Sequence, residues 1–334
     1  MQGKERKDMK DLLQAGCELL ADNKDLIRKN FAWDLELMSV AGSVIFTGAG
    51  KVADIERMKE CKSILKKHKG IFSEFRSNME IPVICKMALA EDPEKYLMDV
   101  TVVYDKLSKG KIFGSEHLVM TALAICDEQV ANNIDGIVEK TKLLMKRMSS
   151  IHPWLTSEED TALVALLALT NKSVDQIVEE TELCYNLMKQ KFSFHNNAVQ
   201  SLSHVLALCA GEPQEKCARA SAIYDALLVK GIKYGLDYEL ASLGALVNVD
   251  LTPEELADEI AAASDYLRTR KGFGDWGMGS KARVMFAALL TVQAYAPSST
   301  AMDTSVLSSA LAAVIAEEIC FMIIMASVAA SSSN

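Results

Sequence analysis

Residues 161–170 read Thr-Ala-Leu-Val-Ala-Leu-Leu-Ala-Leu-Thr, an apolar stretch that contains the pair Ala168-Leu169. The same pair recurs near the end of six apolar stretches, at Ala88-Leu89, Ala122-Leu123, Ala168-Leu169, Ala207-Leu208, Ala245-Leu246 and Ala288-Leu289. Successive pairs are 34, 46, 39, 38 and 43 residues apart, a spacing typical of helical-hairpin repeats. Alanine in every copy predicts a close helix–helix contact, and the leucine beside it supplies a buried side chain.

A second, amphipathic helix is predicted ahead of each apolar stretch. In one of these helices the apolar residues fall at i, i+3, i+7 and i+10, on a single face: Leu97, Val100, Tyr104 and Leu107. Three prolines stand at the expected first position of the helix, where no N–H group is lost: Pro93, Pro213 and Pro253. Three strings have the spacing of capping boxes: 156–159, 173–176 and 252–255. Each repeat therefore consists of two helices.

These signals predict an all-α fold, a right-handed stack of about seven helical hairpins that is either an open α-solenoid or a closed α/α-toroid. Six hairpins are predicted at 52–91, 93–127, 132–171, 173–211, 213–249 and 252–293, within the range 52–293, and a divergent one at 8–46. Because consecutive hairpins share one core, residues 1–334 are predicted to form a single helical-repeat domain.

The C-terminal segment, residues 302–330, is almost entirely small or aliphatic. The adjacent carboxylates Glu317 and Glu318 interrupt it at the middle, which opposes a membrane span because each charge is costly in lipid. A helix that is apolar nearly all round should be buried in protein. We expect this helix to pack in the concave side of the hairpin stack.

Charge and cysteine content exclude several classes of protein. There are 36 basic and 45 acidic residues, for a net charge of −9, which opposes binding to nucleic acid and to anionic membranes. The eight cysteines form no CxxC pair and no metal-ligand pattern, so we expect no metal site. Unpatterned thiols and the lack of a secretory signal predict a cytoplasmic protein. The sequence specifies no cofactor and no catalytic constellation.

The repeat reveals polar residues in slots that are otherwise apolar. Five residues before the repeated alanine the slot holds Val83, His117, Leu163, Leu202, Leu240 and Arg283, and three before it the slot holds His204 in the fourth copy. Two interpretations remain open. The residues line a polar pocket on the inner face, or each histidine is hydrogen-bonded in the core while the arginine reaches solvent.

Two further sets of residues are candidates for a site. His152 precedes Pro153 and Trp154, where it either acts as a base or ligand or belongs to a turn whose tryptophan fills the core. If the C-terminal helix is enclosed, Glu317 or Glu318 needs a partner. The available partners are Arg76, His117, His204 and Arg283.

Several strings resemble the recurring motifs of a bacterial family of unknown function: Phe72-Ser-Glu-Phe-Arg76, His152-Pro-Trp-Leu-Thr156 followed by Glu159-Asp160, Leu202-Ser-His204-Val-Leu206 and Leu243-Gly-Ala-Leu246. The resemblance covers most of the chain and implies an all-helical, cytoplasmic bacterial protein. It implies no activity, substrate or cofactor.

Two classes of function remain. The first is a non-catalytic binding or scaffold protein that holds a protein or peptide partner on its concave face, as stacked hairpins commonly do. The alternative is an enzyme or small-molecule binder with a polar cavity between the inner face of the hairpins and the C-terminal helix.

Overall fold

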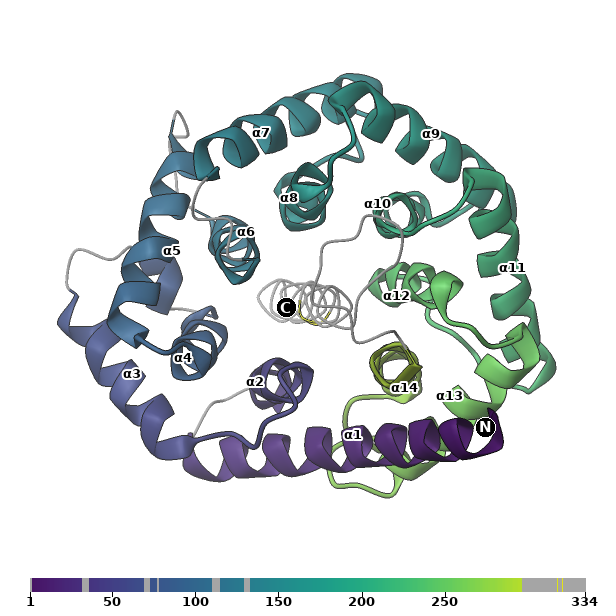
Figure 1. Cartoon of the computed structure of the whole chain (residues 1–334), viewed down its shortest axis with the longest axis horizontal. Coiled ribbons are helices and arrows are strands. Elements are labelled where there is room, and N and C mark those ends of the chain that lie inside the picture. Colours follow the sequence, from purple (N-terminus) through teal and green to yellow (C-terminus); the bar gives the residue numbers. More distant parts are fainter. Residues whose placement is uncertain are drawn as a thin grey trace.

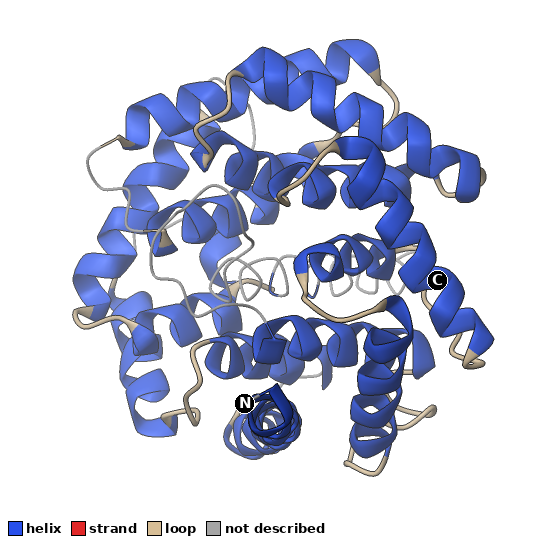
Figure 2. Cartoon of the chain, turned by 45° about the vertical axis from the view of Figure 1, so that its right-hand side comes forward, coloured by secondary structure: helices blue, strands red, loops and turns tan. Residues whose placement is uncertain are grey.

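The fold was analysed in a computed structural model, which describes residues 2–31, 36–68, 73–76, 78–109, 115–128, 133–295, 317 and 320. Over these residues all regular structure is helical, as Figure 2 shows, which confirms the predicted fold class. The segment 302–330, predicted as a C-terminal helix, lies outside the described residues except for Glu317 and Cys320, both of which are buried.

The helices alternate between an outer and an inner layer (Figure 1). The outer layer contains α1 (Gln2–Asn30), α3 (Ile55–Lys67), α5 (Pro93–Ser108), α7 (Ile134–Ile151), α9 (Val174–Lys191), α11 (Pro213–Val229) and α13 (Pro253–Arg268). The inner layer contains α2 (Glu36–Gly48), α4 (Glu80–Leu89), α6 (Glu116–Asp127), α8 (Thr161–Leu169), α10 (Asn196–Leu208), α12 (Ala241–Ala245) and α14 (Ser280–Tyr295). From α3 onward, each outer helix and the inner helix after it lie within the range predicted for one hairpin, except that α14 ends two residues beyond 293.

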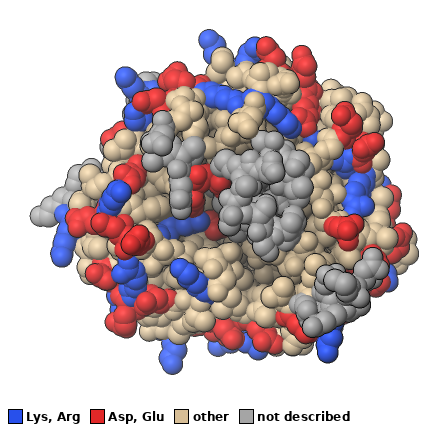
Figure 3. Space-filling model, viewed as in Figure 1, with Lys and Arg blue, Asp and Glu red and all other residues tan. Residues whose placement is uncertain are grey.

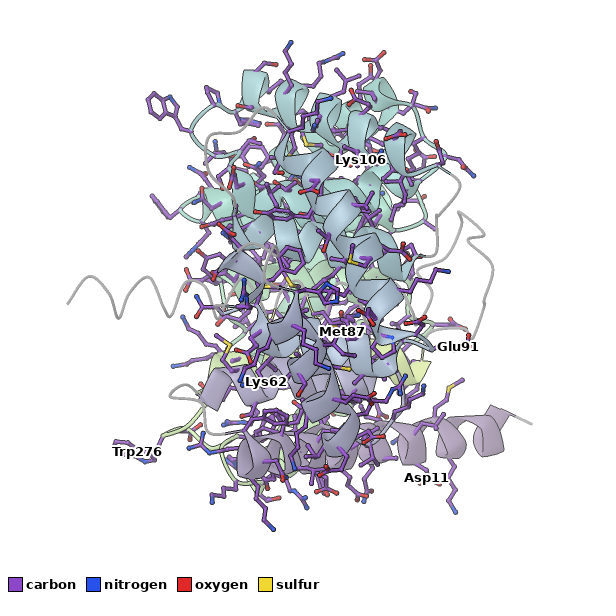
Figure 4. All side chains as sticks on the ribbon, turned by 90° about the vertical axis from the view of Figure 1, so that its left-hand side faces the viewer. Asp11, Lys62, Met87, Glu91, Lys106 and Trp276 are labelled. Carbon is purple, nitrogen blue, oxygen red and sulfur yellow. The ribbon has the colours of Figure 1, made fainter. Side chains whose placement is uncertain are left out.

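The hairpins form a closed ring rather than an open array. The first helix, α1, packs against α13 and α14 as well as against α2, so that the two ends of the array meet (Figure 1). We call the face with the turns from outer to inner helices the turn face, and the opposite one the return face. Figure 4 views the ring edge-on and shows Trp276, in the turn between α13 and α14, opposite Glu91, in the turn after α4.

The inner helices are apolar on almost every side because they have neighbours on almost every side. Every residue of α8 from Thr161 to Ala168 is buried, whereas α5 buries only one face. The six repeated alanines are at most 8% exposed, which confirms that this slot lies at helix contacts. The inner layer is therefore part of the core, and the turns between helices carry more of the solvent-accessible side chains.

Basic side chains bind the carbonyl groups where inner helices end. Arg57 donates to the carbonyl oxygens of Ala88 and Ala90, at 3.2 and 3.0 Å. The last carbonyls of a helix lack partners within it and carry partial negative charge, so Arg57 stabilises the end of α4. Arg219 binds the carbonyl oxygens of Val249 and Leu251, in the connection between α12 and α13, at 2.7 and 2.6 Å. Around the rim of the ring, acidic and basic side chains are interspersed (Figure 3).

Local start signals were accurate with one exception. Pro93, Pro213 and Pro253 begin their helices, and the capping boxes at Ser173 and Thr252 are present. The box predicted at 156–159 is shifted by one residue. Ser157 is the N-cap there, and its partner is Asp160, at the end of the short 3-10 helix η2 (Glu158–Asp160).

Candidate functional site

A pocket of about 640 Å³ lies on the turn face, where the turns of three consecutive hairpins meet. The turns connect α7 to α8, α9 to α10 and α11 to α12. Its polar and aromatic lining residues are Trp154, Ser157, Glu159, Asp160, Phe194, His195, Asn196, Asn197, Ser201, Asp237 and Tyr238. Because the turns lie about one repeat apart in the sequence, only the ring brings these side chains together.

Two aromatic side chains flank this pocket. Trp154 is 94% exposed and Phe194 is 95% exposed. The interpretation that Trp154 fills the core is therefore wrong: the turn carries its indole outward from the ring. Large, rigid aromatic surfaces at the edge of a polar pocket are typical of binding sites, because they offer contact area at low entropic cost.

The charged side chains that line the pocket are carboxylates. They are Glu159, Asp160 and Asp237, and no lysine or arginine is present among the described lining residues. Burial raises the pKa of Tyr238, and the charges of Glu159 and Asp237 raise it further. Two of the carboxylates therefore act on the same phenol from different hairpins. The ammonium group of Lys281 lies 3.7 Å from Asp237 Oδ2.

Asp160 is the buried member of this set. Its Oδ2 accepts the backbone N–H of Ser157 at 2.8 Å, which completes the capping box and fixes the carboxylate at the pocket wall. Burial raises the pKa of Asp160 to about 7, although the hydrogen bond from Ser157 lowers it. The group is thus partly protonated near neutral pH, a property common among acid–base residues.

His204 lies directly behind Asp160. Its Nδ1 is 3.7 Å from Asp160 Oδ1, and the imidazole is completely buried in α10. Burial lowers the pKa of His204 to about 4, so the ring is neutral at physiological pH. The sequence identified His204 from its slot in the repeat. It did not identify Asp160 as a site residue, although Glu159-Asp160 belongs to one of the strings that resemble the family motifs, and the capping box predicted at 156–159 lies one residue too early to include it.

The structure brings together two of the predicted site residues. His152, the residue after α7, and His204 line the same small cavity between α7, α9 and α10. His152 Nε2 is 2.9 Å from Glu182 Oε1 on α9. Arg76 is exposed at the end of the 3-10 helix η1 (Ser73–Arg76), and His117 is half-buried in the first turn of α6.

The remaining predicted residues lie elsewhere. Arg283 on α14 donates to the carbonyl oxygen of Phe273 at 2.9 Å and to Asp275 at 2.8 Å, so it fastens the turn before its own helix. Glu317 is buried, as expected for an enclosed carboxylate, but it pairs with Lys86 and not with one of the four partners predicted from the sequence, which are Arg76, His117, His204 and Arg283. Glu318 lies outside the described residues.

Lys86 forms a buried charged cluster with residues of three elements. Its Nζ is 2.6 Å from Asp127 Oδ2 and 2.5 Å from Glu317 Oε2, and Tyr96 donates to Asp127 Oδ1 at 2.7 Å. Burial alone would lower the pKa of Lys86, but Asp127 and Glu317 raise it above its ordinary value. A signal was present in the sequence. Two residues before the repeated alanine, the slot holds Lys86, Met120, Leu166, Val205, Leu243 and Phe286.

Neither a metal site nor a membrane span is found in the part of the chain that the structure describes. No group of three or more histidine, cysteine, aspartate or glutamate residues there is arranged to hold a metal ion. Among the same residues, no helix has both the length and the apolar character that a span requires.

Comparison with known proteins gives a family match over most of the chain. A family model described as a protein of unknown function, DUF4003, matches residues 23–319. The chain belongs to this family. An uncharacterized protein from Bacillus subtilis strain 168, YeaA, is 21% identical over 270 residues, which are 80% of each chain. No solved structure matches.

The DUF4003 match begins within α1 and ends just beyond Glu317. It therefore includes every helix of the ring from α2 to α14, the turns that form the pocket, and all residues of the Lys86 cluster.

Proposed function

We propose that the protein is a binding protein whose turn-face pocket holds a ligand with uncharged or positively charged polar groups. One observation carries this proposal. Two almost fully exposed aromatic side chains, Trp154 and Phe194, flank a pocket whose charged lining residues are all acidic. The volume of about 640 Å³ lies in the range typical of small-ligand sites.

The charges of the pocket favour this class of ligand. Helix α10 begins at Asn196 in the pocket wall and carries a partial positive charge of about half a unit at that end. The full charge of Glu159 exceeds this partial charge, and Asp237 adds a second carboxylate whose charge Lys281 balances in part from 3.7 Å. The pocket therefore disfavours anionic ligands. An ammonium or guanidinium group gains both from these carboxylates and from the aromatic faces. Amides and hydroxyl groups find partners in Asn196, Asn197 and Ser201.

The concave side of the ring is a poorer candidate for a partner site. Lys86, on the inner helix α4, is occupied by the chain's own Glu317. A partner that entered at this point would have to displace a buried ion pair, which is strongly unfavourable unless both charges find new partners. The turn-face pocket requires no such displacement.

A thermal-shift screen tests the proposal. The panel contains polyamines, lysine- and arginine-rich peptides and neutral sugars in one arm, and nucleotides, phosphates and acidic peptides in the other. We expect stabilisation only in the first arm, and we expect it to be lost in Trp154→Ala and in Glu159→Gln. Trp276→Ala is the matched control, because Trp276 is equally exposed but does not line the pocket. Stabilisation by anions alone, or stabilisation that survives in Trp154→Ala, would contradict the proposal.

A further inference from the structure

Three buried polar side chains behind the pocket contain side-chain atoms that lack a hydrogen-bond partner among the described residues. The unpaired atoms are Thr181 Oγ1, Gln200 Oε1 and the ring nitrogens of His204, none of which has a partner within the described part of the chain. The amide nitrogen of Gln200 is engaged, because it donates to Thr156 Oγ1 at 3.0 Å. Buried polar groups are almost always hydrogen-bonded, so several orphans in one place require an explanation.

The three residues line one cavity, together with His152 and Glu182. Its volume is about 10 Å³, close to that of a single water molecule as measured with a water-sized sphere. A water there can accept a hydrogen bond from the Thr181 hydroxyl and donate to the Gln200 carbonyl. The second O–H group or the second lone pair of the water is then available for a hydrogen bond with His204. The cavity is about the size of one water molecule and offers it three polar side chains with unpaired atoms, which are the conditions for a buried water.

His204 faces a different group on each side. Its Nδ1 is 3.7 Å from Asp160 Oδ1, so Nε2, the other ring nitrogen, is the one available to a group in the cavity. On the far side of the cavity, His152 and Glu182 form a pair at 2.9 Å whose side chains are each about a quarter exposed. The pocket and the solvent are thus connected by groups that can each donate or accept a proton.

We propose that Asp160, His204 and a water bound in this cavity form a proton relay between the turn-face pocket and the His152–Glu182 pair. Asp160 gives its proton to His204 Nδ1, the Nε2–H proton passes to the water, and the water gives one of its own protons to the pair. His204 and the water end with the proton number with which they began. The relay rests on the proposed function, because its first member, Asp160, lines the ligand pocket. It extends that function, since a ligand bound in the pocket would exchange a proton with Asp160.

Electrostatics fits this role. Burial holds the pKa of Asp160 near 7, and Glu159, on the same 3-10 helix, raises it. Burial lowers the pKa of His204 to about 4, so the ring changes tautomer rather than charge. Among the described residues, the titratable groups that share this cavity or contact with His204 are Asp160 from η2, His152 from the end of α7, and Glu182 and Tyr185 from α9. At 3.7 Å the contact between Asp160 and His204 is longer than a hydrogen bond, so the proposal requires an approach of about 0.5–1 Å.

The tautomer of His204 gives a direct test in the ligand-free protein, independent of whether a pocket ligand is found. Ring nitrogen chemical shifts distinguish the two tautomers and the charged form, and His204→Gln assigns the signals. Protonated Asp160 donates to Nδ1 and leaves the proton on Nε2, whereas ionised Asp160 requires the proton on Nδ1. We therefore expect a neutral ring that converts from Nε2–H to Nδ1–H with a midpoint near pH 7.

Two variants separate this coupling from a general effect of pH. Asp160→Asn supplies an amide that donates to Nδ1 at every pH, so the Nε2–H tautomer should persist throughout. Asp175→Asn is the control: Asp175 lies exposed on α9, where it pairs with Arg147 of α7, and its replacement should leave the conversion unchanged. A single pH-independent tautomer in the wild-type protein, or a conversion that persists in Asp160→Asn, would overturn the relay. So would a high-resolution crystal structure in which the cavity next to Thr181 and Gln200 is empty.

Discussion

Replacing Lys86 with methionine should destabilise the protein strongly. The ammonium group of Lys86 lies between the carboxylates of Asp127 and Glu317, and the Lys86 and Glu317 side chains are only 11% and 7% exposed. Methionine preserves the volume of the stem but leaves the buried carboxylate of Glu317 and the half-buried one of Asp127 without their cation. Removing one partner of a buried ion pair typically costs about 3–5 kcal/mol, and we expect a loss in this range near neutral pH.

The size of the loss should depend on pH. Burial raises the pKa of Glu317 from 4.5 to about 7, while Lys86 lowers it. The folded protein therefore binds more protons at this group than the unfolded chain does, and its contribution to stability falls as the pH rises through about 7. Without Lys86 the pKa of Glu317 rises further, so the loss continues at higher pH. The effect of Lys86→Met should consequently be larger at pH 8.5 than at pH 5.5.

Urea unfolding followed by circular dichroism at both pH values measures this effect. Lys230→Met is the matched control, because Lys230 pairs with Asp258 at the surface, where such a pair contributes at most about 1 kcal/mol. A loss below about 1 kcal/mol for Lys86→Met, or an equal loss at the two pH values, would refute the assignment of Glu317 to this cluster.

Three further predictions follow from the ring and the pocket. Ala207→Leu should lower the free energy of unfolding by about 1–3 kcal/mol because Ala207 is fully buried, and urea unfolding should show no comparable loss for the exposed Ala222→Leu. Arg219→Met should cost about 1.5–3 kcal/mol because it removes two charged hydrogen bonds to the carbonyls after α12, and hydrogen exchange should increase there. Because burial raises the pKa of Asp160 to about 7, the wild-type protein should lose stability as the pH rises from about 4 to 7, and Asp160→Asn should remove this loss. The same dependence of the free energy of unfolding on pH in both proteins would contradict the prediction.

The hairpins could be predicted because their signals are local. A proline at the first helical position, a capping box and an apolar stretch each act within one or two turns of a helix. The closure of the ring is different in kind. It depends on a contact between α1 and α14, which are separated by almost the whole chain, and on a small rotation per repeat that no single residue specifies.

The pocket could be predicted only in part, for a related reason. His204 stood out as a departure from the repeat and His152 by its place before Pro153 and Trp154, and both histidines line the cavity behind the pocket. One of the two interpretations of His152 assumed that Trp154 fills the core, because large aromatic residues are usually well buried, but the turn leaves Trp154 exposed. Asp160 was missed because a shift of one residue in a capping box exchanges which carboxylate faces inward.

The polar residues in the apolar slots of the repeat fall into two groups, and the difference between them indicates where function lies. Arg283 and Lys86 are fully engaged by partners that fasten a turn and Glu317, so their presence in the core is explained by structure alone. His204 is not: it remains buried beside two other side chains with unpaired groups. Buried polar groups without hydrogen-bond partners reduce stability. Arg283 and Lys86 have such partners, whereas at position 204 a leucine in place of the histidine would remove the unpaired atoms altogether. Their position directly behind the one carboxylate that is buried in the pocket wall is the reason to seek the chemistry of this protein there.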